Sequence, residues 1–289
     1  MLDNLFLMIN HNQNKIEALL SIGITTKGRI DELRETLKLL ENSELNVCNI
    51  ILIDDGGCGD FISSNEYNLN LSICRFEASE GLVARRNQLA DLCDTKYLMS
   101  LDDDSTPESG SVLEALDLME SNESIATIAL NLYNNSTCHA DPNSPNYYAR
   151  YFVGCGHIHD VGVFKSLGGY TGGLIYGHEE REYALKLARA SKKIIHVNNY
   201  VVKHRKSSIN RVVGYNARTS RNLGWVNGTY LGLIPNLVEI YSFMKGKKRP
   251  VIIRCLRDYI EGLTGRGNTR KLSFSQYYHW KQTKTPTVA

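Results

Sequence analysis

The predicted fold depends on the stretch Lys96-Tyr97-Leu98-Met99-Ser100-Leu101-Asp102-Asp103-Asp104-Ser105-Thr106-Pro107. Its apolar first half predicts a buried strand, and the three carboxylates, small polar residues and proline after it predict a loop. In open α/β sheets, ligands bind outside the carboxyl ends of the strands. Hard cations such as Mg²⁺ prefer oxygen ligands, so Asp102 and Asp104 could both bind one divalent metal. The alternative is a solvated acidic turn, because turns favour Asp for local hydrogen bonding.

The composition is that of a globular protein with one large domain, or one domain and an extension. The 289 residues are 42% hydrophobic and 22% charged, which is ordinary for such proteins. Seven cysteines without CxxC spacing predict free thiols and a reduced, cytoplasmic protein. The N-terminus has no secretory signal pattern. No run of about 18 apolar residues predicts a transmembrane helix.

The charge is divided unevenly along the chain. Residues 202–289 contain 17 Lys and Arg but only 3 Asp and Glu, a net charge of +14, whereas residues 1–201 carry −12. A basic segment favours an anionic partner, such as lipid headgroups, a phosphorylated acceptor or nucleic acid. It could also simply pack on the acidic part and offset its charge. Nucleic acid is not expected, because the aromatic residues of this segment lie in apolar helices and not among its lysines and arginines.

Strands and helices alternate along the first half of the chain. Apolar periodicity predicts strands over residues 19–26, 48–53 and 69–76 and helices over residues 30–40 and 82–93. A strand–helix–strand unit makes its two strands parallel, with their carboxyl ends at the same edge of the sheet. The predicted fold is therefore α/β, with a mostly parallel central sheet flanked by helices.

Polar side chains follow three of these strands and should line one crevice. They are Thr25 and Thr26, Asp54 and Asp55, and Asp102–Asp104, with Arg85 or Arg86 near the rim. Carboxylates suit a ribose or a metal and an arginine suits a phosphate, so the crevice favours a nucleotide. For each residue taken alone, turn chemistry or a solvated helix face is the alternative.

The second half of the chain contains a further cluster of acidic residues, which follows a glycine-rich segment. Residues 133–151, rich in Asn, Ser and Pro, predict a loop over the crevice. Three acidic residues then begin a helix, where the helix dipole alone would favour them; they are Glu179, Glu180 and Glu182. They follow a glycine-rich segment of the kind that brings the backbone close to a ligand. His204 lies in a basic run, where a lone histidine is usually a surface residue.

Residues 211–289 predict a basic, amphipathic, helical extension. Residues 230–244 are apolar on nearly every side and are interrupted by Pro235, and Ile252–Leu263 predict an amphipathic helix flanked by arginines. Such helices suit a membrane surface. Packing against the first domain, or against a second subunit, would use the same pattern.

Five segments, in order, resemble the inverting glycosyltransferases of family 2, nucleotide-sugar-dependent enzymes of GT-A fold. Residues 21–29 are similar to the family's opening strand, residues 53–57 to V-D-D-G-S, residues 81–87 to G-x-x-x-A-R-N, residues 101–104 to the DxD motif, and residues 177–180 to G-W-E-D. His204 and Arg221-Asn222 stand where the family often has a His and an Arg-Asn pair. Thr25 replaces a proline of the family pattern, and His178 and Glu180 replace Trp and Asp.

The resemblance implies a role for each matching residue. It implies donor binding by Thr25, Thr26, Arg29, Asp54, Asp55, Arg86, Asp102 and Asp103, and a Mn²⁺ or Mg²⁺ ion on Asp102, Asp104 and His204. The implied catalytic base is Glu180, with Glu179 as the alternative. Such a base would take the proton of the acceptor hydroxyl, and direct displacement of the diphosphate would invert the anomeric centre.

The predicted organisation is a GT-A catalytic domain over residues 1–210 and the extension over residues 211–289. Within the domain, nucleotide-sugar binding is expected at about residues 19–107 and the acceptor and catalytic part at about residues 108–210. UDP-sugars are the expected donors because the resembling family uses them most often. The expected acceptor is a saccharide or a lipid-linked glycan of surface polysaccharide or glycoconjugate synthesis, with a small metabolite or a peptide second. The enzyme would then be cytoplasmic, either free or peripheral on the inner face of the membrane, and its oligomeric state is open.

Two rival functions are compatible with the same sequence. A nucleotidyltransferase would need a glycine-rich phosphate loop near residue 23, which the sequence lacks. A nucleotide- or sugar-binding module without catalysis is the other rival, because residues 177–180 depart from the family pattern. Metal-dependent hydrolysis of the donor would separate an enzyme from such a module.

Overall fold

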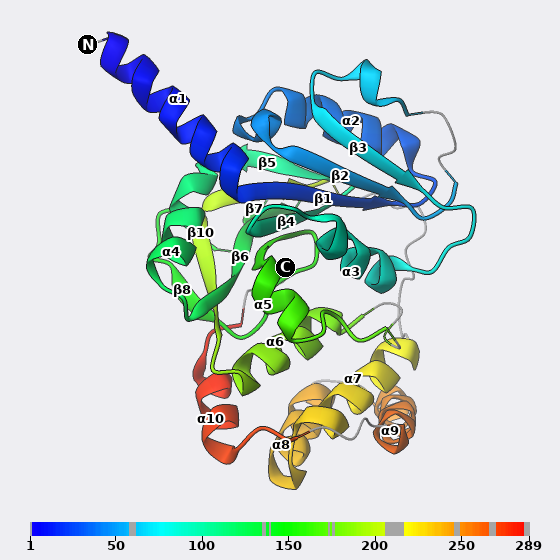
Figure 1. Ribbon diagram of the computed structural model, residues 1–289. Coiled ribbons are helices and arrows are strands. Elements are labelled where there is room, and N and C mark those ends of the chain that lie inside the picture. Colours follow the sequence, from blue (N-terminus) through cyan, green and yellow to red (C-terminus); the bar gives the residue numbers. More distant parts are fainter. Residues whose placement is uncertain are drawn as a thin grey trace.

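The computed structural model describes residues 2–57, 62–134, 137–138, 140–172, 174, 177–205, 217–245, 249–265 and 270–285 (Figure 1). The strands are β1 (Leu20–Thr26), β2 (Asn49–Asp54), β3 (Asn70–Arg75), β4 (Tyr97–Asp102), β5 (Ser105–Ser109), β6 (Ile125–Asn134), β7 (Thr137–Cys138), β8 (Tyr147–Ala149), β9 (Gly156–Asp160) and β10 (Lys193–His204). The helices are α1 (Leu2–Leu19), α2 (Ile30–Glu41), α3 (Leu82–Leu92), α4 (Val112–Ser121), α5 (Val161–Ser166), α6 (Glu179–Arg189), α7 (Ala217–Tyr230), α8 (Leu233–Met244), α9 (Arg249–Thr264) and α10 (Phe274–Gln282), with short 3₁₀ turns at Glu44–Val47 and Ser64–Glu66.

One mixed sheet runs through the molecule in the order β3-β2-β1-β4-β9-β6-β10-β5, with β7 beside β6 and β8 beside β10. Helices cover both faces of the sheet (Figure 1). One apolar core lies between the sheet and α1, α2 and α4, and a second lies between the sheet and α3, α5 and α6. The predicted α/β class and the central sheet flanked by helices are confirmed. The sheet is mixed and not mostly parallel, because β5, β7, β8 and β9 pair antiparallel with their neighbours.

The first four strands in this order are parallel, as the strand–helix–strand pattern predicted. Thr26 of β1 pairs with Asp54 of β2, and Thr25 pairs with Asp102 of β4. The polar residues that end these three strands therefore meet at one edge of the sheet. This register brings together side chains that are up to 77 residues apart in the sequence.

The predicted loop after β4 is shorter than expected. The chain turns at Asp103 and Asp104 and then forms β5, which pairs antiparallel with the end of β10. This pairing gives the backbone groups of β5 hydrogen-bond partners. Pro107 is tolerated because β5 is the edge strand of the sheet, where a missing N–H breaks no necessary ladder bond. The same pairing makes His204 the last residue of a long strand, in place of the predicted surface run.

The prediction of a loop over the crevice at residues 133–151 is wrong for Tyr147–Ala149, which form strand β8. β8 pairs with Ile194–His196, near the start of β10, whereas His204 lies at the other end of that strand. The ring of Tyr147 also stacks on His196, with centroids 4.8 Å apart. These contacts hold β8 at the end of β10 that is opposite to His204.

The C-terminal extension packs as helices at one end of the molecule (Figure 1). α7 and α9 lie very close, because a Cβ added at Gly224 would fall 2.0 Å from the carbonyl oxygen of Tyr259. A third apolar core, which includes Val226, Tyr277 and Trp280, joins the extension to Leu185 of α6. The predicted boundary at residues 210 and 211 lies outside the described residues. No described helix is both long and apolar enough to span a membrane.

Candidate active site

The turn after β4 is held by its backbone, so its carboxylates have fixed positions. The hydroxyl of Thr36 donates to the carbonyl oxygen of Asp103 (2.6 Å), and the N–H of Arg205 donates to that of Asp104 (2.8 Å). The N–H of Asp102 donates to the hydroxyl of Ser105 (2.7 Å). Helix α2, β5 and β10 therefore fix the turn together.

The carboxylates of Asp103 and Asp104 face the end of β1. The hydroxyl of Thr26 donates to Asp103 (2.7 Å), and Arg29 contacts Asp103 through Nε (3.2 Å) and Asp104 through Nη1 (2.8 Å). Burial raises the pKa of Asp103 to about 6 in spite of Arg29. Burial opposes ionisation of Asp104 too, but His204 and Arg29 hold the pKa of that carboxyl well below its usual range. Asp104 is therefore ionised at neutral pH.

The predicted metal ligands lie together. The Nε2 of His204 is 3.1 Å from a carboxylate oxygen of Asp104. Asp102, Cys155 and His204 each offer one ligand atom, and these atoms lie within 4.8 Å of one another. Carboxylate oxygens suit Mg²⁺ or Mn²⁺, so Asp102 and Asp104 fit the expected ion, and His204 lies close enough to offer a nitrogen ligand. Cys155 was not predicted, because a lone cysteine in an apolar segment carries no signal beyond that of a small hydrophobe.

Arg86 connects this acidic turn to the start of α6. Its guanidinium lies 3.0 Å from Asp102, 3.4 Å from Glu179 and 3.7 Å from Glu180. Arg86 therefore lies beside the acidic turn, where one of the two arginines was expected. Both Arg85 and Arg86 are buried, which excludes the alternative of a solvated helix face. A buried guanidinium needs charged partners, and the carboxylates around Arg86 supply them.

Arg85 has a different partner, Asp55, which directly follows β2. The carboxylate of Asp55 accepts hydrogen bonds from Arg85 Nε (2.7 Å), the hydroxyl of Ser79 (2.5 Å) and the N–H groups of Glu80 (2.9 Å) and Gly81 (3.0 Å). Four bonds use most of a carboxylate's acceptor capacity. We interpret Asp55 as a residue that positions the start of α3, while Asp54 is buried beside it.

Two residues with left-handed backbone conformation turn the chain into α6. Gly177 has φ 93° and His178 has φ 71°, which favours glycine at the first position and is uncommon at the second. The turn directs both following glutamates toward Arg86. Glu179 is almost completely buried, whereas the side chain of Glu180 keeps 22% of its exposure. Burial and the neighbouring charge of Glu179 raise the pKa of Glu180, and Arg86 offsets only part of that rise.

Gly154 was not predicted to matter for the site, yet it lies against these charges. A Cβ at this position would fall 2.6 Å from both terminal nitrogens of Arg86 and from Oε1 of Glu180. Asn87 makes a second contact that was not predicted. Its side-chain amide donates to the carbonyl oxygen of Tyr170 and accepts from the N–H of Tyr170, with both hydrogen bonds 2.8 Å long. The only sequence signals were the glycines of residues 154–156 and the Arg-Asn pair of α3.

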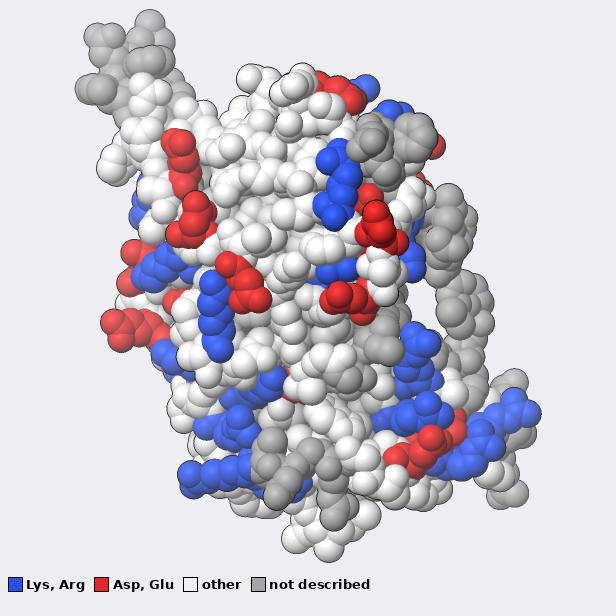
Figure 2. All heavy atoms as spheres, turned by 45° about the vertical axis from the view of Figure 1, so that its right-hand side comes forward, with Lys and Arg blue, Asp and Glu red and all other residues white. Residues whose placement is uncertain are grey.

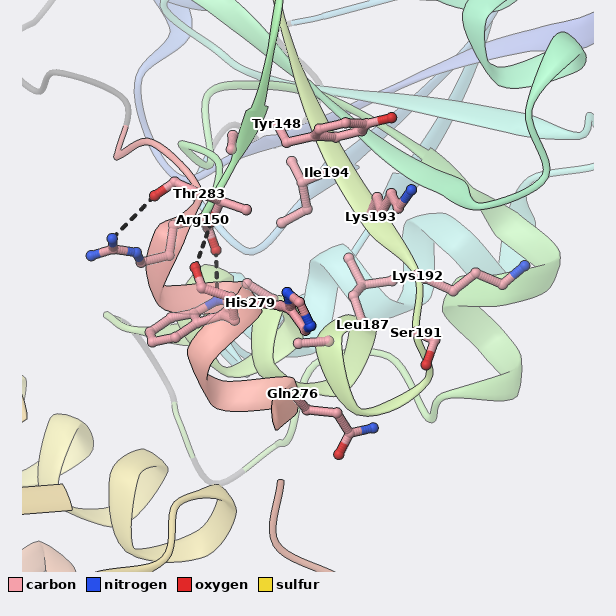
Figure 3. Close-up of a pocket in the computed structure, with 14 residues that line it drawn as sticks. Tyr148, Arg150, Leu187, Ser191, Lys192, Lys193, Ile194, Gln276, His279 and Thr283 are labelled. Atoms are coloured by element: carbon pink, nitrogen blue, oxygen red, sulfur yellow. Dashed lines mark hydrogen bonds between the residues drawn. The ribbon is translucent and has the colours of Figure 1, made fainter. Parts of the chain in front are cut away.

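A separate cavity of about 420 Å³ lies on the other side of α6, between α10 and strands β8 and β10 (Figure 3). None of the predicted site residues lines it. Its walls include Leu187, Ile194 and Trp280, while the side chain of Lys192 points away from it (Figure 3). It is therefore distinct from the place where the acidic turn, Arg86 and the glutamates meet.

Comparisons with known proteins agree with the geometry. Among solved structures, the chain is similar to GalNAc-T7 with UDP, GalNAc and Mn²⁺, at 17% identity and a TM-score of 0.62, covering 84% of this chain and 54% of that one. It is similar to Staphylococcus aureus TarS 1–349 in complex with UDP-GlcNAc, at 14% identity and a TM-score of 0.62, covering 85% and 81%. It is also similar to the mannosyltransferase PcManGT from Pyrobaculum calidifontis in complex with GDP-Man and Mn²⁺, at 10% identity and a TM-score of 0.55, covering 91% and 78%.

At these identities the likeness shows the GT-A fold, and the chain spans only about half the length of GalNAc-T7. No curated protein matches the sequence. The family model described as glycosyl transferase family 2 matches residues 21–170. That match includes β1, β2, α3 and the Asp102–Asp104 turn, and it ends before Glu179. Since it covers more than half of the chain, this protein belongs to glycosyl transferase family 2.

Proposed function

We propose that this protein is a metal-dependent, inverting glycosyltransferase that moves a sugar from a nucleotide-diphosphate sugar to an acceptor hydroxyl. The observation that carries the proposal is Arg86, which contacts Asp102 on one side and Glu179 and Glu180 on the other. Its guanidinium therefore keeps the Asp102–Asp104 turn, which is proposed to bind the donor, next to the candidate base at the start of α6. A transfer reaction needs this arrangement, because both reactants must be oriented in the same site.

Asp102, Asp104 and His204 are the proposed ligands of a Mn²⁺ or Mg²⁺ ion. A bound ion would neutralise the charge that develops on the diphosphate leaving group. The ionised state of Asp104 and its proximity to His204 support this assignment. The Mn²⁺ ions of the GalNAc-T7 and PcManGT structures agree with it.

Glu180 is the proposed catalytic base and Glu179 a positioning residue. Glu180 is partly exposed and its pKa is raised, so once ionised it is a stronger base than an ordinary Glu. Glu179 is nearly inaccessible, so an acceptor could not reach it. In the proposed reaction Glu180 takes the proton of the acceptor hydroxyl as its oxygen attacks the anomeric carbon. The bond to the diphosphate breaks in the same displacement, which inverts that carbon.

Donor binding is proposed for Thr25, Thr26, Arg29, Asp54, Asp103 and Arg86, with Asp55 acting through the start of α3. A UDP-sugar is the preferred donor. Two of the similar structures hold UDP or UDP-GlcNAc, and the third holds GDP-Man. GDP- and dTDP-sugars are therefore part of the test below.

The proposed acceptor is a saccharide or a lipid-linked glycan of surface polysaccharide or glycoconjugate synthesis. The basic extension lies directly beside the proposed base, because Asn222 of α7 donates to the carbonyl oxygen of Gly177 at 3.0 Å. A strongly positive segment at this place suits an acceptor that carries phosphate or is held at an anionic membrane. A small metabolite or a peptide is the second choice.

The test is nucleotide release from UDP-, dTDP- and GDP-sugars with Mn²⁺, with Mg²⁺ and with EDTA. We expect metal-dependent release from one donor, and loss of release in Asp104→Ala and Glu180→Gln. Nucleotide binding is measured in parallel by calorimetry, because hydrolysis without an acceptor can be slow. Metal-dependent binding with no turnover on any acceptor would favour a binding module without catalysis. The absence of metal-dependent nucleotide binding would overturn the proposal.

A further inference from the structure

Helix α8 is oriented opposite to the usual pattern, with polar groups inward and apolar groups outward. Its buried side chains are Pro235 and Glu239. Five large apolar side chains of the same helix are 41–77% exposed: Leu233, Ile234, Leu237, Val238 and Tyr241. Monomeric proteins rarely expose contiguous apolar patches of this kind, and such patches usually mark an interaction site.

The inward side of α8 is fixed by a buried ion-pair network. The carboxylate of Glu239 contacts Arg181 (2.9 Å), Lys281 (2.5 Å) and the hydroxyl of Tyr277 (2.9 Å). Asn236 also accepts a hydrogen bond from the hydroxyl of Tyr259 at 2.6 Å. Turning the apolar side inward would break these bonds and bury the charge of Arg181 without its partner, which is strongly unfavourable. The outward direction of the apolar side is therefore a built-in feature of the fold.

Helix α9, next to α8, also exposes apolar and cationic side chains. Ile253 and Ile260 are exposed two turns apart, and Arg257 lies between them on the same side. The side chain of Arg257 is 75% exposed and contacts the buried carboxylate of Asp258 at 3.1 Å. The rings of Phe243 and Tyr259 join α8 to α9, with centroids 6.4 Å apart. Both helices lie at the lower end of Figure 1, and on the face shown in Figure 2 the charged side chains at the same end are mostly Lys and Arg.

We propose that the exposed sides of α8 and α9 dock this protein on an anionic lipid bilayer. The apolar side chains of α8 would lie among the headgroups and acyl chains, and the arginines of α9 would face lipid phosphates. This is the pattern of an interfacial helix, in which apolar burial and charge attraction act together. A second copy of the chain fits less well, because it would bring two segments of net charge +14 against each other.

The docking deepens the proposed function, because it would place the site at the surface where a lipid-linked acceptor lies. The contact between Asn222 and Gly177 joins the docking helices to the turn that carries Glu180. Membrane binding itself does not require transferase activity. Its failure can therefore be told apart from a failure of the proposed reaction.

The experiment is co-sedimentation of the full chain with two kinds of vesicle, phosphatidylcholine alone and phosphatidylcholine with phosphatidylglycerol. The test variant is Leu237→Ser/Tyr241→Ser, which removes two exposed apolar side chains and leaves Glu239 in place. The matched control is Leu39→Ser/Leu92→Ser, which removes two exposed leucines of α2 and α3, outside the extension. Thermal melting and nucleotide binding are measured for all three proteins to show that they are folded.

We expect the wild type and the control to bind the anionic vesicles, with weaker binding at high salt because counterions screen the arginines. The α8 variant should lose at least about tenfold in binding. Equal binding to the neutral vesicles, or equal binding by the α8 variant, would overturn the proposal. So would a concentration-dependent dimer in sedimentation velocity that the α8 variant abolishes, because the surface would then belong to a second copy.

Discussion

Replacement of Gly154 by alanine tests whether Arg86 and Glu180 must keep their relative position. The added Cβ would fall 2.6 Å from Nη1 and Nη2 of Arg86 and from Oε1 of Glu180. Ordinary contact begins at 3.4 Å, so these atoms must retreat by about 0.8 Å. Arg86 has little freedom to do so, because it is buried between Asp102 and Glu179.

A displacement of about 1 Å in a catalytic constellation can cost roughly 10²-fold in rate. That factor corresponds to about 2.7 kcal/mol of transition-state free energy. Overpacking itself should lower the free energy of unfolding by about 1–3 kcal/mol. We therefore expect Gly154→Ala to fold, to bind the nucleotide, and to lose about two orders of magnitude in kcat with a much smaller change in KM.

The assay is metal-dependent nucleotide release, measured beside a denaturant melt. Gly156→Ala is the matched control, because its Cβ would fall 2.7 Å from Cδ2 of Leu132. That clash is apolar and lies outside the charged group, so the control should lose stability while its kcat stays near that of the wild type. If Gly154→Ala keeps wild-type kcat, or loses no more than Gly156→Ala, the proposed dependence on the position of Arg86 is wrong.

Three further variants test other parts of the structure. Asp104→Ala should weaken Mn²⁺-dependent nucleotide binding by at least about 10²-fold in calorimetry, and unchanged binding would remove Asp104 from the metal site. Glu180 has a pKa of about 8 because of burial and the charge of Glu179; only its ionised form accepts a proton, so kcat should rise with pH through that value. Glu179→Gln should move this rise to lower pH, and an unmoved profile would exclude the coupling. Gly224→Ala places a Cβ 2.0 Å from the carbonyl oxygen of Tyr259 and should lower the melting temperature by separating α7 from α9, whereas an unchanged melt would contradict that packing.

The donor side of the site could be predicted because its geometry follows from local patterns. Alternating strands and helices imply parallel strands, and parallel strands bring their carboxyl ends to one edge. The pairs Thr26 with Asp54 and Thr25 with Asp102 are the direct result. The order of the segments was enough to identify the fold and the family.

The contacts of Arg86, Gly154 and Cys155 could not be predicted from one sequence. Periodicity shows which face of a helix is covered but not what covers it. The hydrophobicity of α3 is nearly the same on all sides of the helix, so periodicity does not separate a buried from an exposed face. Its two arginines are adjacent in the sequence, yet Arg85 binds Asp55, which follows β2, and Arg86 binds Asp102 of β4. Gly154 matters only because Arg86, 68 positions before it, and Glu180, 26 positions after it, both approach its Cα in the folded chain. Such convergence is a property of the folded chain.

The orientation of α8 was also beyond the sequence pattern. An apolar stretch is normally assigned to the interior, and Pro235 looked like an interruption. The proline is the third residue of the helix, in the first turn, where a backbone N–H has no helical partner to lose. Glu239 then decides which side faces inward, because Arg181 and Lys281 come from α6 and α10.

The balance of charge in the site bears on how a donor can bind. Five carboxylates meet two guanidinium groups and one imidazole there: Asp102, Asp103, Asp104, Glu179 and Glu180 against Arg29, Arg86 and His204. Glu180 is mostly protonated at neutral pH, yet the other four carboxylates still outnumber the two guanidinium groups. A diphosphate is itself anionic, so this surplus of negative charge opposes its entry. A nucleotide sugar should therefore bind weakly in EDTA and far more tightly with a divalent cation, in calorimetry at fixed ionic strength. Equal affinity in both conditions would mean that the guanidinium groups release their carboxylates and bind the diphosphate directly.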